Sequence, residues 1–172
     1  STVHLHGWAM RIEYYREPQH YAGLFERDDV PSQRVADDEI LLHVRAGDTM
    51  RGLIVPYMPM PMAWYAAVIA ASGLRPVFIG ELDDTPYVRL LRERFPQARI
   101  LPPASRLSDF QTLRHARHVA LSISSFGWLA AWLSQRAETI HMPVCGLFQP
   151  TAQFANLAPA GDPRYRFYDV PF

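Results

Sequence analysis

The sequence contains one cysteine, Cys145, and therefore cannot form a disulfide bond within the chain. Small secreted domains usually carry several cysteines, so this scarcity favours a reducing compartment, and we expect a cytoplasmic protein. The sequence also lacks the roughly eighteen consecutive apolar residues of a membrane-spanning helix and the basic and apolar regions of a signal peptide. We expect a soluble chain without a transmembrane segment, and peripheral association with a membrane stays open.

An excess of either charge is also absent, since 17 basic residues balance 17 acidic ones. A general nucleic-acid binder carries a basic surface, so we expect no nucleic-acid partner. No GxGxxG sequence, Walker loop or GxSxG elbow occurs, which argues against a dinucleotide dehydrogenase, a P-loop NTPase and a serine hydrolase. The histidines show neither HExxH spacing nor cysteine partners, so we expect no zinc site.

What the sequence does contain, from position 40 onward, is a regular alternation of short β-rich runs with segments of helical length. We predict strands over 40–45, 76–81, 98–101, 118–123 and 139–142. We predict helices over 61–72, 86–95 and 124–136, and one that Ser108 or Asp109 caps and that ends near 114. This order is typical of an α/β fold in which a Rossmann-like parallel sheet has helices on both faces.

The chain length suits one domain, with less regular segments on either side of the alternating part. Residues 1–39 are expected to form an N-terminal segment with a short strand in HLHGW, a helix over 14–27 and a charged linker. Residues 40–149 are expected to form the Rossmann-like domain. Residues 150–172, rich in proline, tyrosine and phenylalanine, are expected to form an irregular C-terminal tail.

Polar residues follow several of the predicted strands at the points where they end. The first strand runs into HVRAGD, the second reaches Asp83 and Asp84, and the fourth runs into Ser122, Ser124 and Ser125. In open α/β sheets, ligands bind beyond the carboxyl ends of the strands. We therefore expect these side chains to converge on one pocket.

Ser124 and Ser125 stand where the last predicted helix begins. Such a start presents free backbone N–H groups and a partial positive charge, which suit a pyrophosphate. The alternative is that one serine only caps its own helix.

Arg45 leaves the first strand at the same edge, and its guanidinium offers two parallel contacts to phosphate oxygens. His43 lies two residues earlier, so strand alternation puts both side chains on one face. The alternatives are an ion pair between Arg45 and Asp48, and a histidine whose hydrogen bonds are satisfied within the core.

Three further aspartates, Asp83, Asp84 and Asp109, could accept hydrogen bonds from a base or ribose, and the first two could hold a metal. Each could equally well cap a helix. Trp128 and Trp132, four residues apart on the last helix, are more typical of packing than of a binding platform.

In order and spacing, LLHVRAGD, FIGELDD and HVALSISSFGWLAAWL resemble the motif blocks of fucosyltransferases that carry an HxRRxD-type sequence. The last block is similar to the NSSFSWWGAWL run of the alpha-1,2-fucosyltransferases, glycosyltransferase family 11. It matches at Ser124, Ser125, Phe126, Trp128, Ala131, Trp132 and Leu133. The stretch over 83–96 also resembles the alpha-1,6-fucosyltransferases, and HLHGWAMRIEYY is similar to the LxGYxQxxxYF stretch of the alpha-1,2 group.

This resemblance implies the C-terminal, donor-binding half of a GT-B-type glycosyltransferase, with an acceptor-side half expected to precede residues 1–39. It implies GDP-fucose as the donor, a glycan as the acceptor, inversion at the anomeric centre, and neither metal nor cofactor. By position it implies that Arg45 holds the donor phosphates and is catalytic. The other donor-binding positions that it indicates or that the strand ends supply are His43, Gly47, Asp48, Asp83, Asp84, Asp109, Ser124, Ser125 and Phe126.

Two departures from the family pattern leave other functions open. Ala46 stands where the family often has a second arginine, and Ile123 where the alpha-1,2 group has asparagine. A non-catalytic nucleotide-binding module, or an isolated donor-binding half, is the second hypothesis. A third is an α/β domain for another phosphorylated metabolite.

Overall fold

The computed structural model describes residues 10–47, 58–149 and 155–170, and its centre is a fully parallel six-stranded sheet. The strands are β2 (Glu39–Val44), β3 (Arg75–Gly80), β4 (Arg99–Ile100), β5 (His118–Ala120), β6 (Thr139–Val144) and β8 (Tyr165–Asp169). They lie in the order β4-β3-β2-β5-β6-β8. This is the strand order of a doubly wound α/β fold, so the expected α/β sheet with Rossmann-like topology is confirmed.

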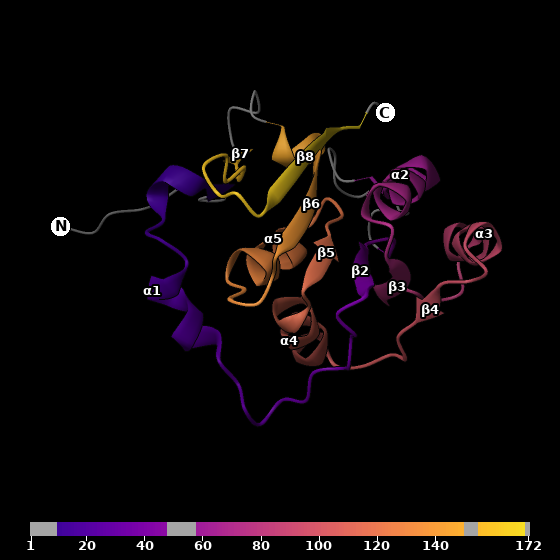
Figure 1. Ribbon diagram of the computed structural model, residues 1–172, viewed down its shortest axis with the longest axis horizontal. Helices are drawn as coiled ribbons and strands as arrows, with labels where there is room; N and C mark the ends of the chain where they lie inside the picture. The colour runs from indigo at the N-terminus through magenta and orange to yellow at the C-terminus, as the bar shows by residue number, and fades with distance from the viewer. Residues whose placement is uncertain (1–9, 48–57, 150–154, 171–172) are drawn as a thin grey trace.

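The crossover helices divide between the two faces of the sheet. The connections β2 to β3 to β4 contain α2 (Met62–Ser72) and α3 (Pro86–Arg94), and the connections β4 to β5 to β6 contain α4 (Arg106–His115) and α5 (Ser125–Trp132). Because parallel crossovers are right-handed, a reversal of strand order moves the helices to the other face. Figure 1 shows α2 and α3 on one side of the sheet, with α4 and α5 on the other.

Local sequence signals explain the ends of the predicted helices. α2 follows Pro61 and ends at Gly73, whose φ of 67° is the left-handed conformation that favours glycine at a helix end. Thr85 caps α3 by accepting the Val88 N–H, and Pro86 occupies the first turn, where its missing N–H costs nothing. The residues of β2 are all buried, as expected for a central strand covered on both faces.

The predicted start of α4 was wrong. Ser105, not Ser108 or Asp109, is the cap, and its hydroxyl accepts the Ser108 N–H at 3.1 Å. Ser108 instead lies buried inside the helix and donates to the Pro31 carbonyl oxygen. A serine at either position satisfies the capping pattern, so the sequence alone does not separate them.

The N-terminal segment forms short pieces rather than the one helix predicted over 14–27. These are η1 (Ile12–Tyr14), α1 (Gln19–Ala22) and η2 (Gly23–Phe25), while β1 (Met10–Arg11) pairs with β7 (Ala155–Asn156). Figure 1 shows this segment on the same side of the sheet as α4 and α5. The buried Arg114 of α4 fixes it there by donating to the carbonyl oxygens of Phe25 and Ala22. The strand expected in HLHGW lies outside the described residues.

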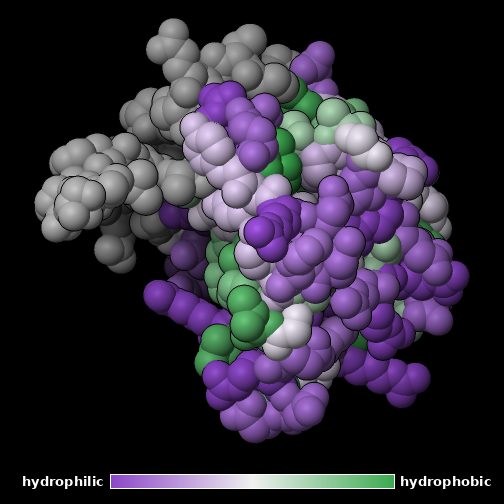
Figure 2. Space-filling view, turned by 90° about the vertical axis from the view of Figure 1, so that its left-hand side faces the viewer, coloured by the Kyte–Doolittle hydropathy of each residue, from purple (hydrophilic) through white to green (hydrophobic). Residues whose placement is uncertain are grey.

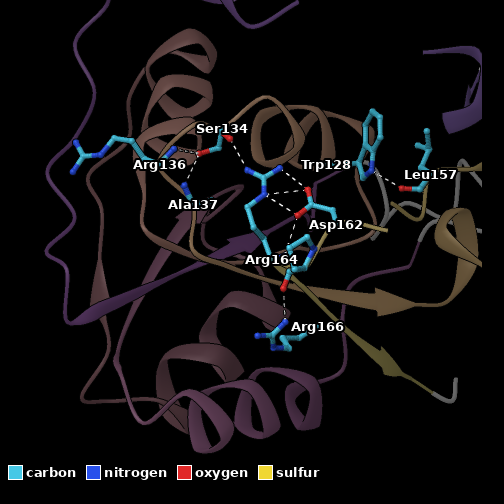
Figure 3. A network of polar contacts seen from close by, with 9 residues as sticks. Trp128, Ser134, Arg136, Ala137, Leu157, Asp162, Arg164 and Arg166 are labelled. Carbon is cyan, nitrogen blue, oxygen red and sulfur yellow. Dashed lines mark hydrogen bonds and ion pairs between the residues drawn. The ribbon is translucent and has the colours of Figure 1, made fainter. Parts of the chain in front are cut away.

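The C-terminal part differs most from its expected form, because an irregular tail over 150–172 was predicted and β8 is a strand of the main sheet. β8 pairs in parallel with β6, after a connection that includes η4 (Gly146–Phe148). Figure 3 shows how its start is fixed: the Arg164 guanidinium binds the Asp162 carboxylate and donates to the Ser134 carbonyl oxygen at 2.6 Å. This tertiary anchor lies 30 residues away along the chain and leaves no local signal. The sheet therefore extends beyond the domain boundary predicted at 149.

Figure 2 views the molecule from the side of the N-terminal segment, and this face is mainly hydrophilic. Its apolar residues form small separate areas rather than one broad patch. None of the helices in the described ranges has both the length and the apolar character required to span a bilayer.

Candidate functional site

The strand order reverses between β2 and β5, which are neighbours in the sheet. From β2 the chain proceeds to β3 on one side, and from β5 it proceeds to β6 on the other. The crevice at such a reversal, beyond the carboxyl ends of the strands, is the common ligand site of doubly wound sheets. Arg45 follows β2 there, and Ser122 and Ser124 follow β5.

His43 and Ser122 join the two sides of this reversal. The His43 Nδ1 and the Ser122 Oγ share a buried hydrogen bond of 2.7 Å. The His43 ring also lies against the first turn of α5, because a Cβ added at Gly127 would come within 2.8 Å of Nδ1. Phe126 stacks on the same ring with centroids 6.2 Å apart. His43 therefore holds the end of β2 against the start of α5.

The buried position of His43 also determines its charge. Burial, with a further contribution from the positive charge of Arg45, lowers the pKa of His43 to about 4 from its ordinary value of 6.5. The ring is neutral near pH 7, and one of its nitrogens is already occupied within the protein. The interpretation of His43 as a buried, internally hydrogen-bonded residue is therefore confirmed, while its predicted contact with a donor stays a prediction.

The loop after β2 is held by Glu81, a residue that we did not predict to belong to the site. The Glu81 Oε2 accepts the backbone N–H groups of Ala46 at 2.8 Å and Gly47 at 2.7 Å. Gly47 therefore lies in this loop, as expected. Its backbone N–H binds the Glu81 carboxylate, and its predicted contact with a donor stays a prediction. Asp48 follows directly and lies outside the described residues, so its predicted role stays a prediction.

The two serines at the start of α5 differ in environment. Ser124 is the N-cap, is 3% exposed, and accepts the Gly127 N–H through its Oγ at 3.3 Å. The capping interpretation is thus confirmed for Ser124. Ser125 is half-buried at the first helical position, where backbone N–H groups and the positive end of the helix dipole are presented. Of the two hydroxyls, that of Ser125 is the better candidate for a phosphate contact.

Asp109 lies in the first turn of α4, which packs on α5. The ring of the adjacent Phe110 contacts that of Phe126, with centroids 5.4 Å apart. Burial raises the pKa of the half-buried Asp109 carboxyl to about 6. A carboxyl that titrates near neutral pH can accept or donate a hydrogen bond to a ligand, so Asp109 stays a candidate on that ground.

Asp83 and Asp84 follow β3, on the side of β2 away from the reversal. Both are exposed, and Asp84 pairs with Arg89 of α3 at 2.9 Å. Thr85 caps α3, so the alternative that Asp83 or Asp84 caps this helix was wrong. Asp84 is therefore bound to α3, and the predicted contacts of both aspartates with a donor stay predictions.

The aromatic part of α5 belongs to the core. Trp128 and Trp132 are buried and stacked, with ring centroids 5.3 Å apart, and the Trp128 Nε1 donates to the Leu157 carbonyl oxygen. Their predicted packing role is confirmed. A half-open hollow of about 610 Å³ lies beside Trp132, lined also by Tyr15, Arg16 and residues 158–163. None of the predicted site residues that the structure describes lines it.

Two other kinds of chemistry find little support in the described ranges. No group of three or more His, Cys, Asp or Glu side chains there is arranged to hold a metal ion. Cys145 is buried and free, and burial raises the pKa of its thiol to about 12, which makes it a poor nucleophile.

No protein-family model matches this sequence, and a search of curated proteins finds no match either. A function for this chain must therefore come from the chemistry of the site.

Proposed function

We propose that this chain is the donor-binding half of a GT-B-type glycosyltransferase that transfers fucose, or a related sugar, from a GDP-sugar to a glycan acceptor with inversion. The observation that carries the proposal is the meeting of β2 and α5 at the reversal of strand order. There the buried His43 packs against Gly127, and one sheet edge holds both the arginine that follows β2 and the backbone N–H groups that begin α5.

The chemistry of such a donor fits these groups. The acceptor oxygen attacks the anomeric carbon, the bond from that carbon to the β-phosphate oxygen breaks, and GDP leaves with the electron pair. Negative charge grows on the β-phosphate, where Arg45 and the helix start would stabilise it. Loss of one such preorganised donor typically costs about 3–4 kcal/mol of transition-state stabilisation. We assign the acceptor's proton to no base among the described residues.

Calorimetry with GDP-fucose, GDP and a UDP-sugar tests the proposal. We expect GDP-fucose and GDP to bind and the UDP-sugar to bind more weakly. Replacing Arg45 by alanine should weaken GDP binding about 10- to 100-fold, because a hydrogen bond to a charged group contributes about 1.5–3 kcal/mol. Arg92→Ala, which removes an exposed arginine from α3, is the matched control and should leave the affinity unchanged. Absence of GDP binding by the wild-type protein would contradict the proposal.

A non-catalytic nucleotide-binding module is the second candidate, and one observation favours it. Ala46 stands where the family often has a second arginine, so the chain offers one arginine fewer to stabilise the charge that grows during sugar transfer. GDP binding without sugar transfer or donor hydrolysis, measured on the longest natural form of the chain, would favour this module over the enzyme.

A further inference from the structure

Glu81 binds the backbone on both sides of Arg45. Its own N–H donates to the Val44 carbonyl oxygen at 3.0 Å. Its Oε2 accepts the N–H groups of Ala46 at 2.8 Å and Gly47 at 2.7 Å. Three hydrogen bonds from one residue therefore fix the peptide groups that flank the predicted phosphate-binding arginine.

Two glycines are fitted around this arrangement. Gly80 has a φ of 114°, and a Cβ there would come within 2.3 Å of the Val44 carbonyl oxygen, so a larger residue would force β2 and β3 apart just before Glu81. At Gly47, a Cβ would lie 3.1 Å from the Glu81 carboxyl carbon. Gly80 thus permits the close pairing of β2 and β3 just before Glu81, and Gly47 leaves the carboxylate room beside the loop.

We propose that Glu81 is a positioning residue for Arg45. It holds the backbone over 44–47 in one conformation, so that the guanidinium is already oriented when a diphosphate arrives. The inference rests on the proposed function of Arg45. Its physical basis is preorganisation: a loop ordered by a carboxylate does not have to be ordered by the ligand, and the affinity rises accordingly.

The same contacts would also suit an opposite role, in which Glu81 inhibits phosphate binding. Two adjacent backbone N–H groups form a small anion site, and Glu81 could compete with phosphate for them. The two roles predict opposite signs, because removal of a competitor tightens ligand binding and removal of a positioning residue weakens it.

A double-mutant cycle with GDP and inorganic pyrophosphate as probes separates these possibilities. Glu81→Ala should weaken GDP binding about tenfold in the wild-type background, and by less than about twofold when Arg45→Ala is already present. Glu81→Gln keeps an oxygen that can accept both N–H groups and should restore most of the affinity. Glu93→Ala, which removes an exposed glutamate from α3, is the matched control. Equal losses in both backgrounds, or tighter binding by Glu81→Ala, would overturn the inference.

Amide hydrogen exchange without ligand gives a second, independent measurement. We expect the Ala46 and Gly47 amides to exchange slowly in the wild type and in Glu81→Gln, and much faster in Glu81→Ala. Equal exchange in all three proteins would overturn the inference even if GDP binds. Failure of the wild type to bind either probe would instead overturn the proposed function, whatever the exchange rates.

Discussion

The start of α5 and the aromatic part of the same helix lie one after the other in the sequence but differ in what they contact. At the start, Ser124 caps the helix and Gly127 admits the His43 ring of the neighbouring strand. Further along, Trp128 and Trp132 stack on each other and contact Tyr15 of the N-terminal segment. One helix therefore serves the candidate site at one end and anchors the N-terminal segment at the other.

This difference matters for how the motif block is interpreted. The resemblance to fucosyltransferases over SSFGWLAAWL includes Trp128, Ala131, Trp132 and Leu133, which are all buried core residues. Buried residues such as these can match another family because they pack a similar helix, without a shared function. Within this block, only Ser124, Ser125 and Phe126 therefore support a functional resemblance. Arg45, from the first motif block, supports it independently.

The largest expected effect falls on the aromatic part. Trp128→Ala removes a buried ring and leaves the Leu157 carbonyl oxygen without its donor, and we expect a loss of about 3–5 kcal/mol in the free energy of unfolding. Urea denaturation measures this loss. Folded Trp128→Ala protein should still bind GDP with wild-type affinity, and a large loss of affinity would contradict the division between the two parts of α5.

The second effect is a pH dependence at the start of the helix. Because the pKa of His43 is about 4 in the folded protein and ordinarily 6.5, the unfolded chain takes up a proton in this window that the folded protein does not. Stability from the neutral ring is therefore fully present above pH 6.5 and is lost as the pH falls toward 4. His43→Gln removes this titration.

Urea denaturation at pH 7.5 and 4.5 should thus show a fall in stability that is about 2–3 kcal/mol larger for the wild type than for His43→Gln. The raised pKa of Asp109 acts in the opposite direction, but both proteins retain Asp109, so its contribution cancels in the difference. Equal falls would mean that His43 is not buried as described.

The smallest effect concerns the contact between β2 and α5. Alanine at position 127 places its Cβ 2.8 Å from the His43 Nδ1, so the ring or the helix has to move. This strain outweighs the helix-propensity gain of about 1 kcal/mol, and we expect a net destabilisation of about 1–2 kcal/mol together with weaker GDP binding.

Gly161→Ala is the matched control for that substitution. A Cβ at position 161 meets nothing within 4 Å, so the stability should change by less than about 0.5 kcal/mol. Equal effects at positions 127 and 161 would contradict the close packing of His43 on α5.

The alternating part of the fold was predictable because its signals are local. Apolar runs predicted the buried strands β2 and β3. Gly73 follows the end of α2 and Thr85 caps the start of α3, and both residue types are typical of these positions. β8 was not predictable, since its place depends on pairing with β6 and on the distant contact between Arg164 and Ser134. Long-range contacts of this kind leave no periodic pattern.

The residues of the candidate site also divide into those that local sequence signals predict and those that they do not. His43 and the start of α5 could be assigned to one sheet edge from strand alternation and the βαβ order alone. Glu81 could not be assigned, because an exposed glutamate after a strand has no distinctive local pattern. Its proposed role rests on its hydrogen bonds to the Ala46 and Gly47 N–H groups, which only the folded chain shows.

The most direct test of the central claim, that Arg45 and the start of α5 jointly hold a diphosphate, is hydrogen exchange with and without saturating GDP. We predict increased protection at residues 43–47 and 124–127 together, with no change at 132–137. Protection confined to residues 158–163, beside the other hollow, or protection at only one of the two predicted segments would contradict the account.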